Sequence, residues 1–333
     1  MKTVEGNIRA LVTGASSGLG VEFAHLLAAQ GVDLVLAARG VDAMEELAAQ
    51  LRGTCGVEVH VEGIDLAEPG AAQVLKQRLD RQGLRIDTLI NNAGYGVHGE
   101  FLGADPARIS AMLQLNVVTL TELTHLYGTE MAARGKGRIL LVASLLGYMA
   151  APSYAAYAAT KAYIRSLGES LHDEFAPRGV TVTVLAPGLT ATAFADVSGH
   201  KVSALLKMMM MQPRPVAEIG LRALMAGRTG VVPGVANTLA AWSARLMRPA
   251  TPDHAGVAVL IAPCARPAPC CEATHAAKHK ARVRVRWRCP TAASRAVHWV
   301  ERTDAVRTHA HDGRADRRAA DVVLNIRRPR AST

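Results

Sequence analysis

The sequence predicts a doubly wound α/β fold with a mostly parallel sheet, and three observations lead to this prediction. Short β-branched or aliphatic runs alternate six times with longer segments of helical periodicity. The runs are almost continuously apolar, as at Leu34, Val35 and Leu36, which is typical of strands buried on both faces. A glycine-rich turn separates the first run from the first helical segment. Right-handed crossovers would then place helices on both faces of the sheet.

The predicted elements follow one another without an internal repeat. The expected strands cover residues 8–12, 32–37, 57–61, 86–90, 138–142 and 180–185, with a short last strand at 231–232. The expected helices cover residues 22–30, 44–51, 71–79, 109–133, 155–175 and 216–226. Residues 189–213 show no clear periodicity, so we expect an irregular segment there.

The composition favours a chain with a folded core over a wholly disordered one. Of 333 residues, 50% are hydrophobic, 20% are charged and 4% are aromatic, which indicates an aliphatic interior. The net charge of +10 is unevenly placed, because residues 1–250 hold 22 Lys and Arg against 21 Asp and Glu, whereas residues 251–333 hold 16 against 7. We therefore expect one domain over residues 1–250 and a basic tail over residues 251–333.

The tail is rich in Ala, Arg, His, Pro and Cys and has no sustained period, so we expect it to be mostly disordered and dispensable for chemistry. Its cysteines lack the paired spacing of structural zinc sites, so no metal is expected. Its basic residues form no recognisable binding module, so no specific nucleic acid is expected. Whether the tail is native or comes from a shifted reading frame in a GC-rich gene stays open.

The sequence shows no sign of export or of a membrane span. The apolar run at residues 8–12 is too short for the core of a signal peptide, and no stretch approaches the roughly 20 apolar residues of a transmembrane helix. Cys55 is the one cysteine in residues 1–250, so this part cannot form an internal disulfide, which suits a reducing compartment. We expect a cytoplasmic protein and leave peripheral membrane association open.

The glycine-rich turn predicts a nucleotide site. Gly14 suits the tight turn after the strand, Gly18 lets backbone approach a pyrophosphate, and Gly20 permits close packing of helix and sheet. The helix that follows offers free N–H groups to phosphate at its N-terminus. The residues expected around the phosphates also include Ser16, Ser17 and Leu19.

The spacing of this turn resembles the Thr-Gly-x3-Gly-x-Gly motif of the classical short-chain dehydrogenase/reductase family. Further motifs follow in that family's order: Asn91-Asn92-Ala93-Gly94, then Ser144, then Tyr157 with Lys161, and then Pro187-Gly188. The resemblance covers about residues 8–249. It implies a Rossmann-like fold, a nicotinamide cofactor and the interconversion of a carbonyl and a secondary alcohol on a small molecule.

Arg39, at the end of the second predicted strand, favours NADP(H), because an arginine at this place can pair with the ribose 2′-phosphate. Asp42 lies close enough in sequence to keep NAD(H) possible. The resemblance implies further cofactor contacts along the adenosine and nicotinamide sides, from Asp65, Leu66, Asn92, Ala93, Gly94, Pro187, Gly188 and Thr190.

Tyr157 is the expected general acid and base. Lys161 lies four residues later on the same helical face, about 5–6 Å away, where its charge can lower the pKa of the tyrosine from about 10. Tyr154 and Tyr163 have no lysine at this spacing. The resemblance implies that Lys161 also holds the nicotinamide ribose. Ser144 is expected to bind the substrate carbonyl and stabilise its developing charge.

Asn116 is a lone polar residue on the apolar side of the long predicted helix, and a buried asparagine needs hydrogen-bond partners. The resemblance implies that it interrupts the helix and orders a water joined to Lys161, which completes an Asn-Ser-Tyr-Lys tetrad. An ordinary core asparagine is the alternative. The resemblance also implies a homo-dimer or homo-tetramer through the helices near Ile109 and Ala155.

The substrate side is expected to be apolar, which favours a lipophilic ketone or aldehyde. The residues proposed to cover the ligand are Phe194, Val197, Val202, Leu205, Leu206 and the methionines 208–211, and Met adapts to irregular shapes. Further candidates for the pocket wall are Tyr95, His98, Leu146, Tyr148 and Met149. The alternative function is a dinucleotide-binding regulatory or scaffolding protein that does not turn over substrate.

Overall fold

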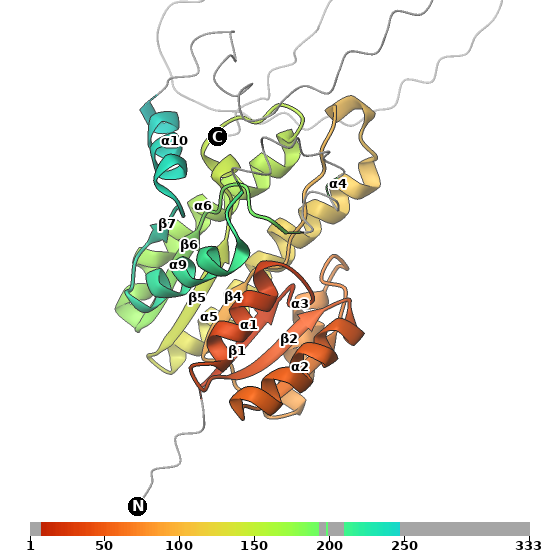
Figure 1. Cartoon of the computed structure of the whole chain (residues 1–333), viewed down its shortest axis with the longest axis vertical. Coiled ribbons are helices and arrows are strands. Elements are labelled where there is room, and N and C mark those ends of the chain that lie inside the picture. The colour runs from red at the N-terminus through yellow and green to blue at the C-terminus, as the bar shows by residue number, and fades with distance from the viewer. Residues whose placement is uncertain (1–7, 193–197, 199–209, 247–333) are drawn as a thin grey trace, which may run out of the picture. The chain divides into compact units, whose positions relative to one another are not determined.

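The computed structural model describes residues 8–192, 198 and 210–246. Within these residues one parallel sheet of seven strands has the order β3-β2-β1-β4-β5-β6-β7. The chain starts near the centre, winds outward to β3, returns to β4 beside β1 and winds outward again to β7 (Figure 1). This is the predicted doubly wound topology, and its direction reverses between β1 and β4.

Every predicted strand is present, with ends that shift by two residues at most. The strands are β1 (Arg9–Thr13), β2 (Asp33–Ala38), β3 (Val59–Gly63), β4 (Thr88–Asn91), β5 (Gly137–Val142), β6 (Val180–Leu185) and β7 (Gly230–Val231). β2 is buried along its whole length, as expected for a strand that helices cover on both sides.

The helices between the strands lie where the periodicity places them. They are α1 (Leu19–Ala28), α2 (Val41–Cys55), α3 (Ala71–Arg81), α4 (Pro106–Leu113), α5 (Leu120–Ala133), α6 (Ala155–Phe175) and α9 (Pro213–Met225). Single turns are formed by η1 (Phe101–Gly103), η3 (Leu145–Tyr148) and η4 (Ala176–Arg178). α6 begins and ends at the predicted residues.

Neighbouring strand residues point to opposite faces of the sheet and so contribute to two cores. Leu11 packs with α3, α5 and α6, whereas Val12 packs with α1, α2 and α9, and both are 0% exposed. Tyr127 on α5 and Phe23 on α1 are the largest side chains with almost no exposure in the respective cores. The strand ends that carry the predicted site residues are therefore held rigidly from both sides.

The helix predicted over residues 109–133 is present but is not uniform. Asp105 accepts a hydrogen bond from the Ala107 N–H at 2.9 Å and Pro106 occupies the first turn, so α4 begins with favourable capping. A π-helical turn, η2 (Gln114–Thr119), then joins α4 to α5. Asn116 lies inside this turn, in agreement with the expected interruption of the helix.

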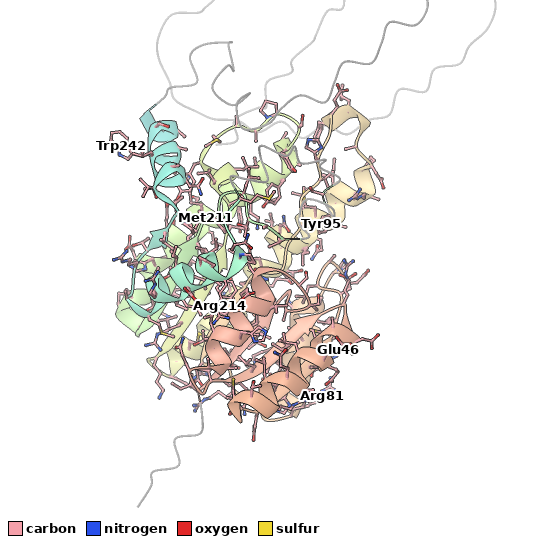
Figure 2. The ribbon with its side chains drawn as sticks, in the orientation of Figure 1. Glu46, Arg81, Tyr95, Met211, Arg214 and Trp242 are labelled. Atoms are coloured by element: carbon pink, nitrogen blue, oxygen red, sulfur yellow. The ribbon has the colours of Figure 1, made fainter. Side chains whose placement is uncertain are left out.

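A further helix, α10 (Val235–Leu246), was not predicted. Its apolar residues do not form a buried stripe: Val235 is 79% exposed, Leu239 61% and Trp242 63%, and Figure 2 shows Trp242 pointing away from the fold. The helix begins instead with side-chain hydrogen bonds to the preceding turn, from Asn237 to the Pro233 carbonyl and from Thr238 to the Gly234 carbonyl. Such local hydrogen bonds leave no periodic signal in the sequence.

Among the described residues, no helix is both long and apolar enough to cross a bilayer. The predicted boundary near residue 250 and the tail, with Cys264, Cys270, Cys271 and Cys289, lie outside the described residues. The expectations for that part of the chain stay predictions.

Two neighbouring residues on α3 allow a test of the second core. Leu75 is 0% exposed and packs in the cluster with α5 and α6, whereas Val74 is 41% exposed. We expect Leu75→Ala to lower the free energy of unfolding by roughly 2–5 kcal/mol, because it leaves a cavity. Val74→Ala should change it by less than about 0.5 kcal/mol. Urea unfolding measures both, and equal losses would contradict this arrangement of the core.

Candidate active site

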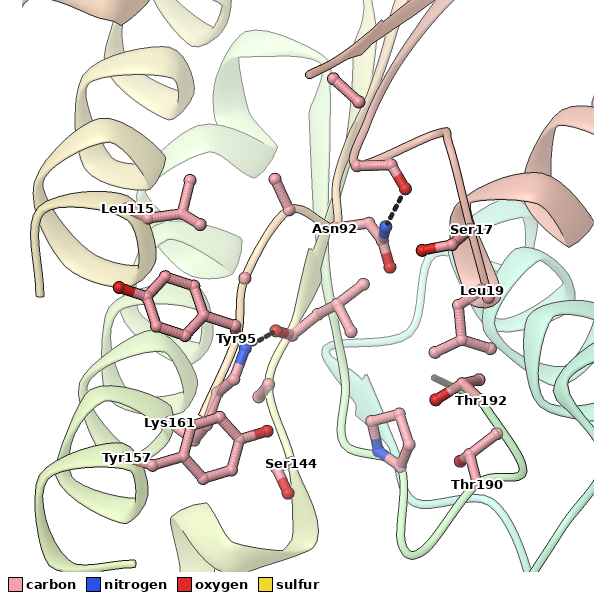
Figure 3. Close-up of a pocket in the computed structure, with 18 of the residues that line it drawn as sticks. Ser17, Leu19, Asn92, Tyr95, Leu115, Ser144, Tyr157, Lys161, Thr190 and Thr192 are labelled. Atoms are coloured by element: carbon pink, nitrogen blue, oxygen red, sulfur yellow. Dashed lines mark hydrogen bonds between the residues drawn. The ribbon is translucent and has the colours of Figure 1, made fainter. Parts of the chain in front are cut away.

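The carboxyl ends of the central strands open into a cavity of about 480 Å³ (Figure 3). Seventeen of the predicted site residues line it: Gly14, Ser16, Ser17, Gly18, Leu19, Arg39, Asp65, Leu66, Asn92, Ala93, Gly94, Ser144, Tyr157, Lys161, Pro187, Gly188 and Thr190. Gly20 and Asn116 lie behind this wall and support it. Ligands of open parallel sheets bind at this edge, where the strand order reverses.

The glycine-rich turn has the geometry of a phosphate site. Gly14 has φ +67°, and a Cβ there would lie 3.0 Å from the Asn92 side chain, so the position needs glycine in two respects. A Cβ at Gly20 would overlap the Gly14 carbonyl, so α1 can approach β1 only with glycine at position 20. No side chain caps α1 at Gly18. Its first N–H groups are therefore available to an anion in the cavity.

The turn after β1 and the loop after β4 are joined by hydrogen bonds. The Thr13 hydroxyl accepts from the N–H groups of Asn92 and Ala93, at 2.9 and 3.0 Å, and donates to the Ile90 carbonyl at 3.3 Å. The Asn92 side chain donates in turn to the Thr13 carbonyl at 2.9 Å. The asparagine therefore fixes the turn and also lines the cavity.

Arg39 and Asp65 form the charged rim at the adenosine end. Arg39 Nη1 lies 3.7 Å from Asp65 Oδ2, and the Arg39 side chain is 73% exposed. Asp65 also accepts from the Ala67 N–H at 2.9 Å, which holds its carboxylate in place. An exposed ion pair of this length is weak. The guanidinium can therefore turn to a phosphate without losing a strong contact.

Tyr157 and Lys161 come from the first turns of α6 and lie against the end of β5, opposite Ser17, Leu19 and Thr192 (Figure 3). Tyr157 is 6% exposed and Lys161 4%. Lys161 Nζ donates to the Val142 carbonyl at 2.8 Å and lies 5.6 Å from the centre of the Tyr157 ring. The pair thus has the separation that the four-residue spacing predicts.

Burial dominates the electrostatics of this pair. It raises the pKa of Tyr157 well above its ordinary value, and a hydrogen bond with Ser144 opposes the rise. Burial lowers the pKa of Lys161 to about 8. Desolvation of the phenolate is therefore the larger effect on the pKa of Tyr157, and the expectation that Lys161 lowers this pKa stays a prediction. With its pKa raised, the Tyr157 hydroxyl is protonated at neutral pH.

Ser144 ends the strand segment of β5 and begins η3. Its hydroxyl accepts from the Leu146 N–H at 3.2 Å, which caps the short helix. The same side chain hydrogen bonds with Tyr157. Its two partners hold the hydroxyl at the cavity wall beside the phenol.

Asn116 is 0% exposed and joins three parts of the site. Its Oδ1 accepts from the Tyr95 N–H at 3.2 Å, and its Nδ2 donates to the Tyr95 carbonyl at 2.9 Å and to the Thr160 hydroxyl at 3.2 Å. A Cβ on Gly94 would lie 2.9 Å from Asn116 Oδ1 and 3.5 Å from Lys161 Nζ. The π turn therefore brings the amide beside the buried lysine and ties the β4 loop to α6.

Tyr154 and Thr192 are among the residues of the cavity wall that sequence reasoning missed. Tyr154 precedes Tyr157 by one helical turn, a signal that was available, since residues three apart share a helix face. Thr192 lies against the glycine-rich turn, 3.2 Å from the place of a Cβ on Gly18. No sequence signal indicated this contact, because it joins segments far apart in the chain.

The predicted substrate wall is found in part. Tyr95, Leu146 and Met210 line the cavity, whereas His98, Tyr148 and Met149 are not among the lining residues of the described chain. Met211 packs against the core beside α9. The other residues proposed to cover the ligand, Phe194, Val197, Val202, Leu205, Leu206, Met208 and Met209, lie outside the described residues.

Known proteins resemble the chain in sequence and in structure. The "very-long-chain 3-oxoacyl-CoA reductase" of Podospora anserina is 34% identical over 56% of this chain, and the match spans 56% of that protein's length. A short-chain dehydrogenase from Sphingobium yanoikuyae, solved in complex with NADPH, is 30% identical with a TM-score of 0.66 and covers 74% of this chain and 98% of its own. The "bulky-bulky ketone specific alcohol dehydrogenase" of Comamonas testosteroni is 27% identical with a TM-score of 0.62, over 74% and 98% of the two chains.

The family profile described as short chain dehydrogenase matches residues 9–202, which run from β1 past the catalytic end of the cavity. This match covers more than half of the chain and contains every motif that lines the cavity. The chain belongs to the short-chain dehydrogenase family.

Proposed function

We propose that the protein is an NADP(H)-dependent oxidoreductase that interconverts a carbonyl and a secondary alcohol on a lipophilic small molecule. The observation that carries this proposal is the position of Ser144, Tyr157 and Lys161 in the same cavity as the glycine-rich turn. A dinucleotide lying along this wall would extend from Arg39 to the catalytic tyrosine. When bound, its nicotinamide donates or accepts the hydride.

The residues of the chain would handle the proton and the orientation of the substrate. Tyr157 is protonated at neutral pH, because burial raises its pKa, so it can donate a proton to a carbonyl oxygen as the carbon receives hydride. The Ser144 hydroxyl beside it can donate a hydrogen bond to the same oxygen. In the reverse direction Tyr157 accepts the alcohol proton. The Lys161 ammonium stabilises the phenolate that forms transiently in reduction.

Arg39 supports the choice of NADP(H). It follows β2 directly, at the place where an acidic residue would bind a ribose 2′-hydroxyl, and its side chain reaches the cavity rim. The neighbouring Asp65 already holds the guanidinium near the adenosine end, at 3.7 Å. The Sphingobium relative was solved with NADPH.

An apolar wall supports a lipophilic substrate. Leu115, Leu145, Leu146, Leu189 and Met210 line the cavity near the catalytic residues. The names of the Podospora and Comamonas relatives point to a long acyl chain in one case and to bulky ketones in the other. Both are ketones that carry a large substituent on the carbonyl carbon.

Exposed apolar residues support assembly into a homo-dimer or homo-tetramer. Leu113 and Val118, on α4 and the π turn, are each 42% exposed, and Tyr163 on α6 is 40% exposed. The hydroxyls of Thr121 on α5 and Tyr163 on α6 lie 3.0 Å apart, so α5 and α6 present one common surface. The cytoplasmic location expected from the sequence stays a prediction.

Replacement of Tyr157 tests the reaction. We expect Tyr157→Phe to lower kcat for carbonyl reduction by about 10²–10⁴-fold, because the variant keeps the ring and loses the proton donor. NADPH binding, followed by fluorescence titration, should be unchanged within about twofold. Tyr163→Phe on the same helix is the matched control and should retain activity. Full turnover by Tyr157→Phe, or NADPH binding with no turnover by the native chain, would favour a non-catalytic binding protein.

Replacement of Arg39 tests the cofactor choice. We expect Arg39→Ala to weaken NADPH binding roughly tenfold or more, since a charge-assisted hydrogen bond to phosphate is lost. The affinity for NADH should change little. Arg214→Ala on α9 removes an arginine that pairs with Glu218 instead and serves as control. Equal effects of Arg39→Ala on both dinucleotides, measured by fluorescence titration, would remove the argument for NADP(H).

The pH dependence of stability tests the burial of Lys161. Its pKa is about 8 in the folded protein against 10.5 in the unfolded chain. Between these values the unfolded chain binds more protons, so the contribution of Lys161 to the free energy of unfolding rises with pH. Relative to Lys161→Met, the native protein should gain roughly 1–3 kcal/mol between about pH 7.5 and 10.5. A difference that does not vary with pH in urea unfolding would mean that the ammonium is solvated.

A further inference from the structure

Tyr154 is a buried aromatic residue of the cavity that the proposed reaction does not use. It is 6% exposed and lines the cavity with Tyr157. The centre of its ring lies 5.8 Å from that of Tyr157, with the planes tilted by 58°. The centre of the His98 ring lies 4.9 Å from that of Tyr154, with the planes tilted by 56°. Tyr154 therefore contacts both the His98 ring and the ring of the proposed catalytic tyrosine.

The backbone holds Tyr154 in this position. Ser153, just before it, has φ 65°, the one positive φ outside glycine in the described part of the chain. An L-residue adopts this conformation only at a cost that its surroundings must offset. Here the Gly99 N–H donates to the Ser153 carbonyl at 2.9 Å, and the Tyr154 N–H donates to the Ala151 carbonyl at 3.0 Å. The segment is therefore built to place the Tyr154 ring at the start of α6.

The polar tip of Tyr154 is engaged within the protein. Its hydroxyl lies 3.3 Å from the Ser198 hydroxyl, in a buried hydrogen bond. The His98 N–H donates to the Ser198 carbonyl at 3.1 Å, so Ser198 is fixed from two sides. Because the hydroxyl of Tyr154 is paired with Ser198, the part of the side chain that can contact a ligand in the cavity is its ring. The packed neighbours Met112 and Ala158 complete an apolar surround.

We propose that Tyr154 is a specificity-determining residue that packs against a flat ring attached to the reacting carbonyl carbon. This inference rests on the proposed role of Tyr157 as proton donor. When the carbonyl oxygen of a substrate binds at Tyr157, a substituent on the carbonyl carbon would lie close to Tyr154, because the two tyrosine rings are 5.8 Å apart. Aromatic rings whose centres lie about 4.5–7 Å apart attract one another more strongly than their buried area alone explains. A linear alkyl chain lacks this extra attraction. The enzyme should therefore prefer aryl ketones to linear ketones of equal size.

Two ketones of equal carbon number, acetophenone and 2-octanone, measure this preference through kcat/KM with NADPH. We expect Tyr154→Leu, which keeps an apolar side chain but no ring, to lower the ratio of acetophenone to 2-octanone about tenfold. Tyr154→Phe keeps the ring and loses only the contact with Ser198, so its ratio should stay within about twofold of the native one. Tyr163→Leu, on the outer side of the same helix, should leave the ratio unchanged.

Three results would overturn the proposal. An equal loss for both ketones in Tyr154→Leu would make Tyr154 a purely structural residue. A tenfold fall in Tyr154→Phe would assign the effect to the hydroxyl. If Tyr154→Leu fails to bind NADPH, Tyr154→Met takes its place as a variant without the ring, and an unchanged ratio in that variant would also refute the preference.

Failure of the proposed function can be told apart from failure of this inference. Turnover of both ketones by Tyr157→Phe refutes the proposed function, whereas a loss of turnover in Tyr157→Phe with an unchanged ratio in Tyr154→Leu refutes only the aromatic contact. If the native protein reduces neither ketone, quenching of bound NADPH fluorescence by acetophenone gives its affinity instead. We then expect Tyr154→Leu to weaken acetophenone binding about tenfold, and an unchanged affinity would refute the contact.

Discussion

The buried ammonium of Lys161 is the constraint on which the rest of the site depends. A cation removed from water is costly unless polar groups surround it, and Lys161 Nζ finds the Val142 carbonyl at the end of β5. To reach it, α6 must lie against the strand end, and a Cβ on Gly147 would collide with the Lys161 carbonyl. Once the lysine is seated, Tyr157 follows one turn earlier, beside Ser144. The position of the phenol is thus a consequence of where the lysine can be satisfied.

The reversal of the strand order explains why two distant motifs share one cavity. β1 and β4 are neighbours in the sheet, although Thr13 and Asn91 lie far apart in the chain. Asn91 continues the connection inward, since its side chain donates to the Leu120 carbonyl at the start of α5 at 2.9 Å. The glycine-rich turn, the loop after β4 and the π turn are therefore linked by hydrogen bonds. The two expected ends of a bound dinucleotide would lie against parts of one rigid assembly.

The predictable features were those that depend on local pattern. Alternating apolar runs located the strands within two residues, and the glycines were recognisable because each has a backbone reason to be glycine. α10 escaped prediction, because its large apolar residues Val235, Leu239 and Trp242 are exposed and form no buried stripe. The place of Tyr154 in the cavity wall depends on ring packing across three segments. The raised pKa of Tyr157 could not be foreseen either, since spacing reports the nearby lysine but not the depth of burial.

One buried hydroxyl limits which sequences can form this site. Thr13 Oγ1 serves three backbone groups at once, the carbonyl of Ile90 and the N–H groups of Asn92 and Ala93. Valine has the same shape but would remove the printed partner of the Ala93 N–H and would leave the Asn92 N–H and the Ile90 carbonyl only their hydrogen bond to each other, whereas serine keeps the hydroxyl and lacks the methyl group. The hydrophobicity of a substituted residue at position 13 is therefore a poor guide to whether the site still forms. Among substitutions along β1, those that keep an oxygen at position 13 should persist in divergent sequences long after the neighbouring aliphatic residues have exchanged freely.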